Sequence, residues 1–173
     1  MKGGDGAGVG ARGVTRLWRG DSAQDAPATQ SPFVDPVLAQ KPDGLVLIPT
    51  DPDALQPSVT KALGANIPVV NVDTHVTDLS QVLSFITGDN GDGGAKAADA
   101  MATAIGSKDG GSYEVVISLT SETATTNVAR REGFQTQVHT QTPAIKLLAQ
   151  RYPQARADTA RQPLNTGPHR AQT

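Results

Sequence analysis

Cysteine is absent from this sequence of 173 residues. Its absence excludes disulfides, thiolate metal sites and cysteine catalysis. Aromatic residues make up only 3% of the chain, so the core must be built from aliphatic side chains, which suits an α/β protein. No apolar run approaches the roughly 20 residues that a membrane-spanning helix needs, so no direct membrane insertion is expected. The formal net charge of −2 gives no reason to expect a nucleic acid as partner.

Catalytic and metal-binding patterns are missing as well. His75, His139 and His169 are isolated in the sequence, and no G-x-S-x-G nucleophile elbow is present. Residues 6–11 satisfy the dinucleotide-binding pattern G-x-G-x-x-G/A, but no strand precedes them and no amphipathic helix follows. The acidic, glycine-rich stretch 88–94 has neither the lysine of a phosphate-binding loop nor the ligand register of an EF-hand. We therefore expect no enzymatic activity, no cofactor and no bound metal.

A strand–helix–strand unit is the clearest feature that the sequence does contain. Residues 45–48 are four consecutive apolar residues after a turn signal, which is typical of a strand covered on both faces. Asp51 can cap the next helix, Pro52 suits its first position and Gly64 can end it. A second buried strand is predicted at 67–72. The crossover should be right-handed, and the two strands should be parallel.

The other predicted elements continue this alternation of strands and helices. Further strands are predicted at 14–18, 81–87, 113–119 and 145–149, and further helices at 21–40, 95–105 and 127–138. Interior prolines weaken the helix at 21–40. Residues 1–12 and 153–173 show no period, so we expect a disordered glycine-rich start and a disordered, solvated tail.

Four ordered motifs resemble the ribose-binding type of periplasmic sugar-binding proteins, a module that also serves as effector domain in repressors of the lactose-repressor type. The motifs are PDGLVLIPTDPDAL, NIPVVNVDTH, SFITGDNGDGGAKAADAM and TTNVARREGF. The resemblance covers about Gly13 to Pro153. It implies an α/β fold of the type I periplasmic-binding-protein kind, with parallel sheets flanked by helices. The expected division is a partial first lobe at 13–87 and a partial second lobe at 88–152.

The resemblance also implies a function. Members of the family bind a small sugar or related polyol between two lobes, by hinge closure, and deliver it to an ABC transporter. A transporter permease is therefore the expected protein partner, and the periplasm the expected location. The N-terminus shows no hydrophobic signal-peptide core, which leaves a cytoplasmic location open for the chain as written.

The predicted ligand-binding residues are polar groups that suit sugar hydroxyls. A carboxylate accepts, and an arginine donates, two hydrogen bonds to adjacent hydroxyls. Asp73 ends the second buried strand, and in the family the Asp at this place hydrogen-bonds the sugar; Thr74 follows it. Asn127 and Arg130 lie three residues apart, on one side of a helix, and Asn90 stands in the glycine-rich loop. We expect Asp73 and the Asn127–Arg130 pair to line one cleft, at the tips of parallel strands.

Structural roles are open for these same residues. Asp73 can cap a turn, and Asn90 can cap the helix that follows it. Arg130 and Arg131 can both be surface residues, and the motif does not decide which of them faces the cleft. Trp18 can stack on a sugar ring or pack at a strand edge.

Two departures from the family favour a further hypothesis. Family members begin with a strand that has no counterpart before Val14, and they continue well past the last predicted strand. We therefore expect partial lobes whose sheet edges are exposed, and such edges favour self-association. A truncated version that binds sugar weakly or not at all is one alternative function. The effector domain of a transcriptional regulator is another, although residues 1–12 cannot form a DNA-binding helix-turn-helix.

Overall fold

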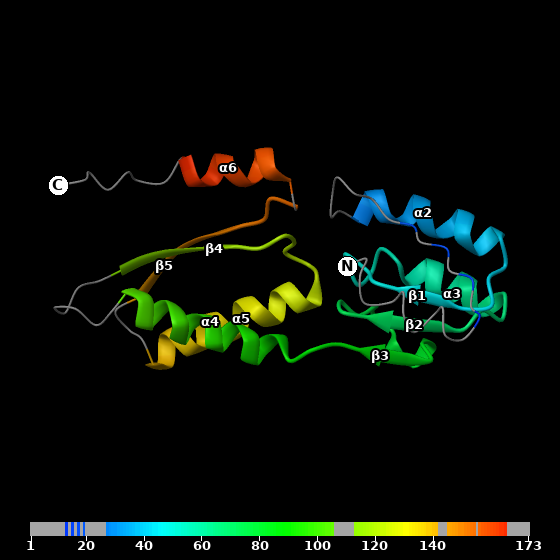
Figure 1. The fold of residues 1–173 in the computed structure, drawn as a ribbon, viewed down its shortest axis with the longest axis horizontal. Coiled ribbons are helices and arrows are strands. Elements are labelled where there is room, and N and C mark those ends of the chain that lie inside the picture. Colours follow the sequence, from blue (N-terminus) through cyan, green and yellow to red (C-terminus); the bar gives the residue numbers. More distant parts are fainter. Residues whose placement is uncertain are drawn as a thin grey trace.

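The computed structural model describes residues 27–105, 113–141, 145–154 and 156–165, together with residues 13, 15, 17 and 19. In chain order the elements are α2 (Pro27–Ala39), β1 (Leu45–Leu47), α3 (Gln56–Gly64), β2 (Val69–Val72), the short 3-10 helix η1 (Leu79–Gln81), β3 (Ser84–Ile86), α4 (Asn90–Ile105), β4 (Tyr113–Ser118), α5 (Thr125–Gln141), β5 (Ile145–Arg151) and α6 (Ala157–Asn165) (Figure 1). The predictions for residues 1–12 and for Trp18 lie outside the described residues, and Thr15 and Leu17 are not in a strand.

Two parallel sheets form the framework of the fold. The first sheet has the order β1-β2-β3 and the second pairs β4 with β5, and every pairing is parallel. In the predicted strand–helix–strand unit, the register runs from Leu45 opposite Val69 to Leu47 opposite Asn71. The predicted α/β class with parallel sheets is therefore confirmed.

One face of the first sheet carries a hydrophobic core. Leu47 and Val69 pack in one cluster with Leu38 of α2 and Val59 of α3. Because side chains alternate along a strand, Val46 points to the opposite face, where it is 69% exposed. The prediction of a strand covered on both faces is thus wrong for β1, since α2 and α3 both pack on the Leu47 side.

The helix of this unit starts later than predicted. The Asp51 side chain accepts hydrogen bonds from the backbone N–H groups of Asp53 and Ala54, both at 2.9 Å. These bonds close a turn, however, and the α-helix itself begins at Gln56. Pro52 therefore lies in the turn and is not the first helical residue.

The same helix ends in a Schellman motif. Asn66 has a φ of 58°, in the left-handed region, and Ala65 is the C-cap. The N–H of Ile67 donates to the Ala62 carbonyl, and the N–H of Asn66 donates to the Leu63 carbonyl, both at 2.9 Å. Gly64 is thus the last helical residue, but the predicted C-cap role belongs to Ala65, one residue later, and Asn66 takes the left-handed conformation, which asparagine also tolerates.

The helices α4 and α5 pack beneath the second sheet with their backbones in contact (Figure 1). A Cβ atom on Gly94 would lie 2.8 Å from the carbonyl carbon of Arg130, and one on Gly133 would lie 2.8 Å from the carbonyl carbon of Gly91. Only glycine allows two helices to approach this closely. The predicted loop 88–94 is consequently helical from Asn90 on, and the prediction of a helix starting near Ala95 is wrong by five residues.

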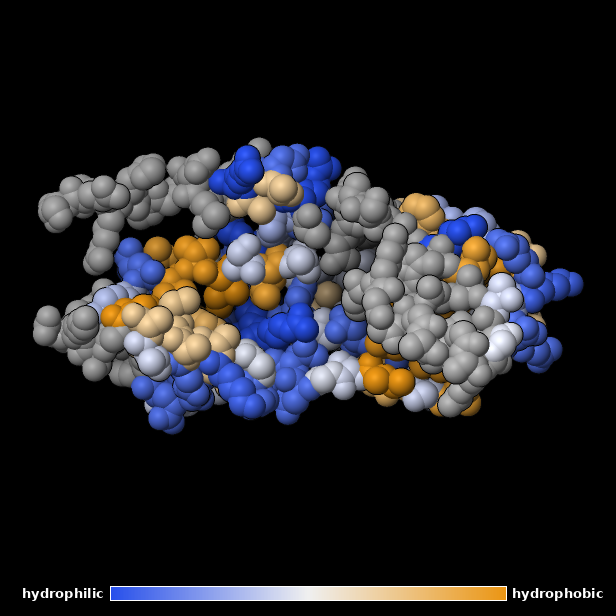
Figure 2. Space-filling model, viewed as in Figure 1, coloured by the Kyte–Doolittle hydropathy of each residue, from blue (hydrophilic) through white to orange (hydrophobic). Residues whose placement is uncertain are grey.

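The second sheet has a smaller core and a partly exposed apolar edge. Val115 and Ile145 are buried with Ala98 of α4 and Val138 of α5. Val116, the next residue of β4, is 43% exposed. Figure 2 shows an apolar area over β4 and the neighbouring part of α4, on the face turned to the viewer.

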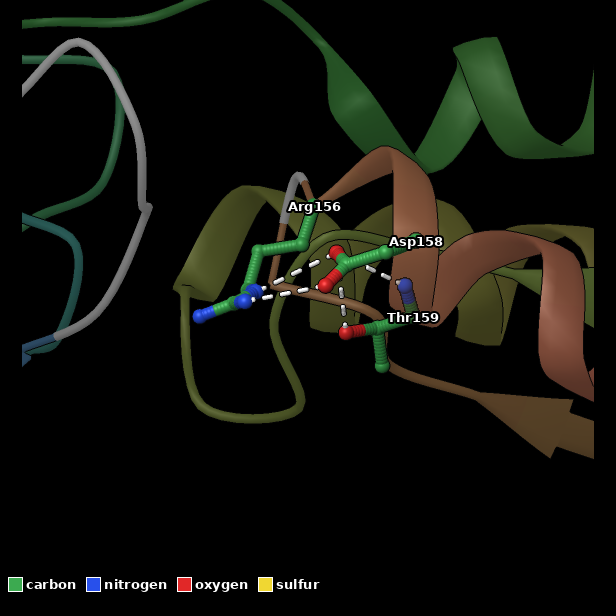
Figure 3. A network of polar contacts seen from close by, with 3 residues as sticks. All are labelled: Arg156, Asp158 and Thr159. Carbon is green, nitrogen blue, oxygen red and sulfur yellow. Dashed lines mark hydrogen bonds and ion pairs between the residues drawn. The ribbon is translucent and has the colours of Figure 1, made fainter.

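The helix α6 replaces part of the predicted solvated tail. Arg156 and Asp158 form an ion pair of 2.9 Å at its start, and the Asp158 carboxylate also accepts from the backbone N–H of Thr159 at 2.9 Å (Figure 3). These hydrogen bonds, above all that from Arg156, lower the pKa of Asp158 to about 2. An Asp in the first turn is a helix-start signal, but the sequence after it has no helical spacing of apolar residues. For that reason this helix was not predicted from the sequence.

Candidate functional site

Asp73 lies directly after β2, at the carboxyl end of the central strand of the first sheet. Its φ is 69°, a left-handed value that aspartate adopts more readily than most residues do. Its N–H donates to the Ile86 carbonyl of the neighbouring strand at 2.9 Å. The carboxyl ends of parallel strands are where open α/β sheets bind their ligands.

A buried asparagine in β2 shapes the turn that follows Asp73. Asn71 is fully buried, and its side-chain N–H donates to the Thr74 carbonyl at 2.8 Å. Its side-chain oxygen accepts from the N–H of Val76 at 2.9 Å. Asn71 therefore holds the Asp73–Val76 turn from below. We did not predict this role, although a polar residue inside the apolar run VVNV was a usable signal.

The turn contacts the N-terminus of α5 directly. The Thr126 hydroxyl donates to the Asp73 carboxylate at 3.4 Å, and it lies 3.3 Å from the Thr74 hydroxyl. The N–H of His75 donates to the Thr125 hydroxyl at 3.1 Å. The end of β2 in the first sheet thus meets the helix that follows β4 in the second. The first amides of a helix lack intrahelical partners and carry partial positive charge, which favours polar ligand oxygens.

A second contact, between the side chains of Asp51 and Thr123, joins the same two regions. Burial tends to raise the pKa of Asp51, but hydrogen bonds from the Thr123 side chain and from the backbone of Ala54 and Asp53 outweigh it. The pKa of this carboxyl is consequently below its ordinary 3.8. The loops after β1 and β2 therefore both reach the segment between β4 and α5.

Two of the predicted ligand-binding residues are occupied by structural contacts. The Thr74 side chain is buried beside Thr126, with 1% of its surface exposed. Asn127 is 6% exposed, and its side-chain N–H donates to the Thr120 hydroxyl at 2.8 Å and to the Ser121 carbonyl at 3.3 Å. Asn127 therefore anchors the loop that leads from β4 into α5.

Asn90 opens α4, and its side chain points back along the chain. Its N–H donates to the Gly88 carbonyl at 3.0 Å and to the Thr87 hydroxyl at 3.2 Å. The capping role belongs to the preceding residue, because the Asp89 carboxylate accepts from the N–H of Asp92 at 2.9 Å. The alternative that Asn90 caps this helix is therefore wrong.

The two arginines of the motif have different surroundings. Arg131 donates to the Tyr152 hydroxyl at 3.3 Å and lies 3.4 Å from the Glu132 carboxylate; these contacts raise its pKa, that with Tyr152 most. Arg130 is exposed, and both arginines line a hollow of about 240 Å³ between α4, α5 and β4. Arg130 also lies one turn after Thr126, on the same side of α5.

The structure thus brings Asp73 and Thr74 to the N-terminus of α5, and places Arg130 one turn further along that helix. Asn90 lies apart, on the segment that leads from β3 into α4. The described ranges contain no group of three or more His, Asp or Glu side chains able to hold a metal ion. Within the same ranges, no helix has the length and apolar character needed to cross a membrane.

Comparison with known proteins places this geometry in a family. Residues 7–166 match the family described as periplasmic binding protein domain. The ribose import binding protein RbsB of Escherichia coli (strain K12) is 35% identical over 114 residues, which cover 65% of this chain and 36% of that protein.

Solved structures of solute-binding proteins are similar to this chain as well. A carbohydrate transporter solute-binding protein of Agrobacterium radiobacter, in complex with D-arabinose, is 30% identical and has a TM-score of 0.82. An ABC transporter solute-binding protein of Agrobacterium vitis, bound with α-D-tagatopyranose, is 31% identical and has a TM-score of 0.81. In both cases the match covers 92% of this chain and 54% of the other, so this chain spans about half the length of these relatives.

These findings agree with the resemblance carried by the four sequence motifs, and the predicted fold type is confirmed. The match also reaches residue 166, past the limit at Pro153 that the motifs indicated. Proteins of this kind bind sugars and are not enzymes. The chain belongs to the family described as periplasmic binding protein domain.

Proposed function

We propose that this chain binds a small sugar or related polyol between the carboxyl end of β2 and the N-terminus of α5. It would act as the periplasmic substrate-binding component of an ABC transporter and would meet the transporter's permease. The observation that carries the proposal is the contact between Asp73 and Thr126, which joins a carboxylate at a strand end to the first turn of a helix.

The chemistry of these groups suits a polyol. The Asp73 carboxylate accepts hydrogen bonds from two adjacent hydroxyls, and it is only partly buried. At 3.4 Å, its bond from Thr126 is long, so a ligand hydroxyl can replace it at small cost. Arg130, one turn further along α5 and exposed, then offers a fork of donors.

Relatives support the substrate class. The structures of the two Agrobacterium proteins contain arabinose and tagatose, and further matched structures contain D-fucose and L-rhamnose. All four ligands are small sugars, which a carboxylate and a helix N-terminus recognise through their hydroxyls. We extend this substrate class to the present chain.

One observation favours an alternative, a version of the fold that binds no sugar. The first sheet exposes large apolar side chains, since Val46 is 69%, Leu83 73% and Ile86 56% exposed. Apolar surface of this extent is usually covered by other protein surface in a stably folded domain. A lobe without that cover would hold Asp73 less rigidly and would bind ligand more weakly.

A thermal-shift series separates the two. Ligand at about a hundred times its Kd stabilises the folded state by about 2.7 kcal/mol. For a chain of this size, such a gain raises the Tm by roughly 5–10 °C. We expect one of ribose, arabinose, tagatose, fucose or rhamnose to produce this shift in the wild type.

Two variants assign the shift to the proposed site. Asp73→Asn should abolish the sugar-dependent shift, because an amide accepts fewer hydrogen bonds than a carboxylate. Asp43→Asn, at an exposed loop position of the same sheet, should leave it unchanged. A wild type that responds to no sugar would favour the alternative, and an undiminished shift in Asp73→Asn would place the ligand elsewhere.

A further inference from the structure

The first turn of α2 carries a glutamine whose side chain bonds the backbone of a distant segment. Gln30 donates from Nε2 to the Ile48 carbonyl at 2.5 Å, and its Oε1 accepts from the Thr50 N–H at 2.8 Å. The Thr50 hydroxyl donates to the same Oε1 at 3.1 Å. Both Gln30 and Thr50 are half-buried. The start of α2 is therefore tied to the loop that leaves β1.

These bonds follow the pattern of parallel strand pairing. In a parallel pair, a residue donates to the carbonyl before the residue that it faces, and accepts from the N–H after it. The Gln30 amide does the same around Pro49, so it takes the place of one peptide of a neighbouring strand. A carboxylate at this position would only accept, and an aliphatic side chain would make neither bond. The loop therefore depends on an amide at residue 30.

The loop that Gln30 holds lies beside the proposed sugar site. β1 and β2 are neighbouring parallel strands, so the loops after them leave the same edge of the sheet. Asp73 stands in the loop after β2, and Asp51 directly follows Thr50 in the loop after β1. The Asp51 carboxylate accepts a hydrogen bond from the side chain of Thr123, in the segment that leads into α5.

We propose that Gln30 is a positioning residue of the proposed sugar site, and the inference rests on that proposed function. By fixing the loop after β1, Gln30 places Asp51 where Thr123 can reach it. This contact holds the start of α5 at the end of β2, where α5 meets Asp73. A site whose parts are in place before the ligand arrives binds more tightly, because less ordering is required on binding.

A measurement without sugar tests the first step. Gln30→Met keeps the length of the side chain and removes its amide. The pKa of Asp51, followed by carbon-13 NMR, should rise about as much as in Thr123→Val, because burial still raises it while the bond from Thr123 is lost. Gln40→Met is the matched control and should leave this pKa unchanged, since Gln40 donates to the Pro36 carbonyl of α2 itself. An unchanged pKa of Asp51 in Gln30→Met overturns the proposal.

A sugar titration tests the second step. With a sugar that binds the wild type, Gln30→Met and Thr123→Val should each raise the Kd about tenfold in isothermal titration calorimetry. Gln40→Met should leave the Kd unchanged. The double variant Q30M/T123V should bind no worse than either single variant, because both substitutions break the same link. A purely structural loss at Gln30 would instead add to the loss at Thr123, so additive losses overturn the proposal.

Two further outcomes are decisive. Thr123 is exposed, so Thr123→Val tests the link even if Gln30→Met fails to fold, and an unchanged Kd in Thr123→Val overturns the positioning role. A wild type that binds no sugar refutes the proposed function, and with it any role of Gln30 in binding. The pKa of Asp51 then still shows whether Gln30 places the loop, so the two failures are distinguishable.

Discussion

Substitution of Gly94 by alanine should destabilise the protein, although alanine is the better helix former. The new Cβ atom would lie 2.8 Å from the carbonyl carbon of Arg130 and 2.9 Å from the backbone nitrogen of Phe134. The carbonyl oxygen of Arg130 would lie closer still. Ordinary contacts lie at about 3.5–4.0 Å, so α5 would have to move away by more than about 1 Å. All these obstacles are backbone atoms of a helix, and none can rotate aside.

The magnitude follows from two opposing effects. Overpacking typically costs about 1–3 kcal/mol, and a backbone obstacle belongs at the upper end of that range. The gain in helix propensity from glycine to alanine offsets about 1 kcal/mol. The free energy of unfolding should therefore fall by about 2 kcal/mol, which lowers the Tm by roughly 4–8 °C for a chain of this length.

The neighbouring glycine provides the matched control. A Cβ atom on Gly93 would meet nothing within 4 Å, although Gly93 lies in the same helix, α4. Gly93→Ala should consequently raise the Tm by roughly 2–4 °C, since only the propensity gain remains. Urea and thermal unfolding, followed by circular dichroism, measure both variants. If Gly94→Ala were as stable as Gly93→Ala, the close crossing of α4 and α5 would be refuted.

Three further predictions test other parts of the chain. Asn71→Ala should lower the free energy of unfolding by about 2–4 kcal/mol, because the buried N–H of Val76 loses its acceptor and a cavity remains. A urea titration that shows a loss under about 1 kcal/mol would contradict this prediction. Asn66→Ala should cost about 1 kcal/mol, since alanine resists a φ of 58°, whereas Asn66→Gly should cost nothing by the same measurement. Carbon-13 NMR should show Asp158 titrating with a pKa of about 2. Its ion pair with Arg156 should therefore be intact above the ordinary pKa of 3.8 and be lost as the pH falls through about 2. Arg156→Gln should move the pKa of Asp158 back toward 3.8, and an unchanged pKa would exclude the ion pair.

Local patterns in the sequence predicted the elements of the first sheet well. The apolar runs at 45–48 and 67–72 contain β1 and β2, and the turn residues between them enclose α3. These signals act over a few residues, so a single sequence contains them in full. The patterns were less accurate for α4 and α6, where glycines or polar residues masked the helical period.

The chain order of residues determined that parallel strands would form and that Asp73 would stand at the end of one of them. The family of the chain follows from the motifs around Asp73. Only the tertiary structure decided which neighbours each polar group meets: Asn127 is occupied by its loop, Arg131 by Tyr152, while Asp73 meets Thr126 from 53 residues away. The contact between Asp73 and Thr126 depends on how the end of β2 and the start of α5 are placed in space, and no local sequence pattern records that placement.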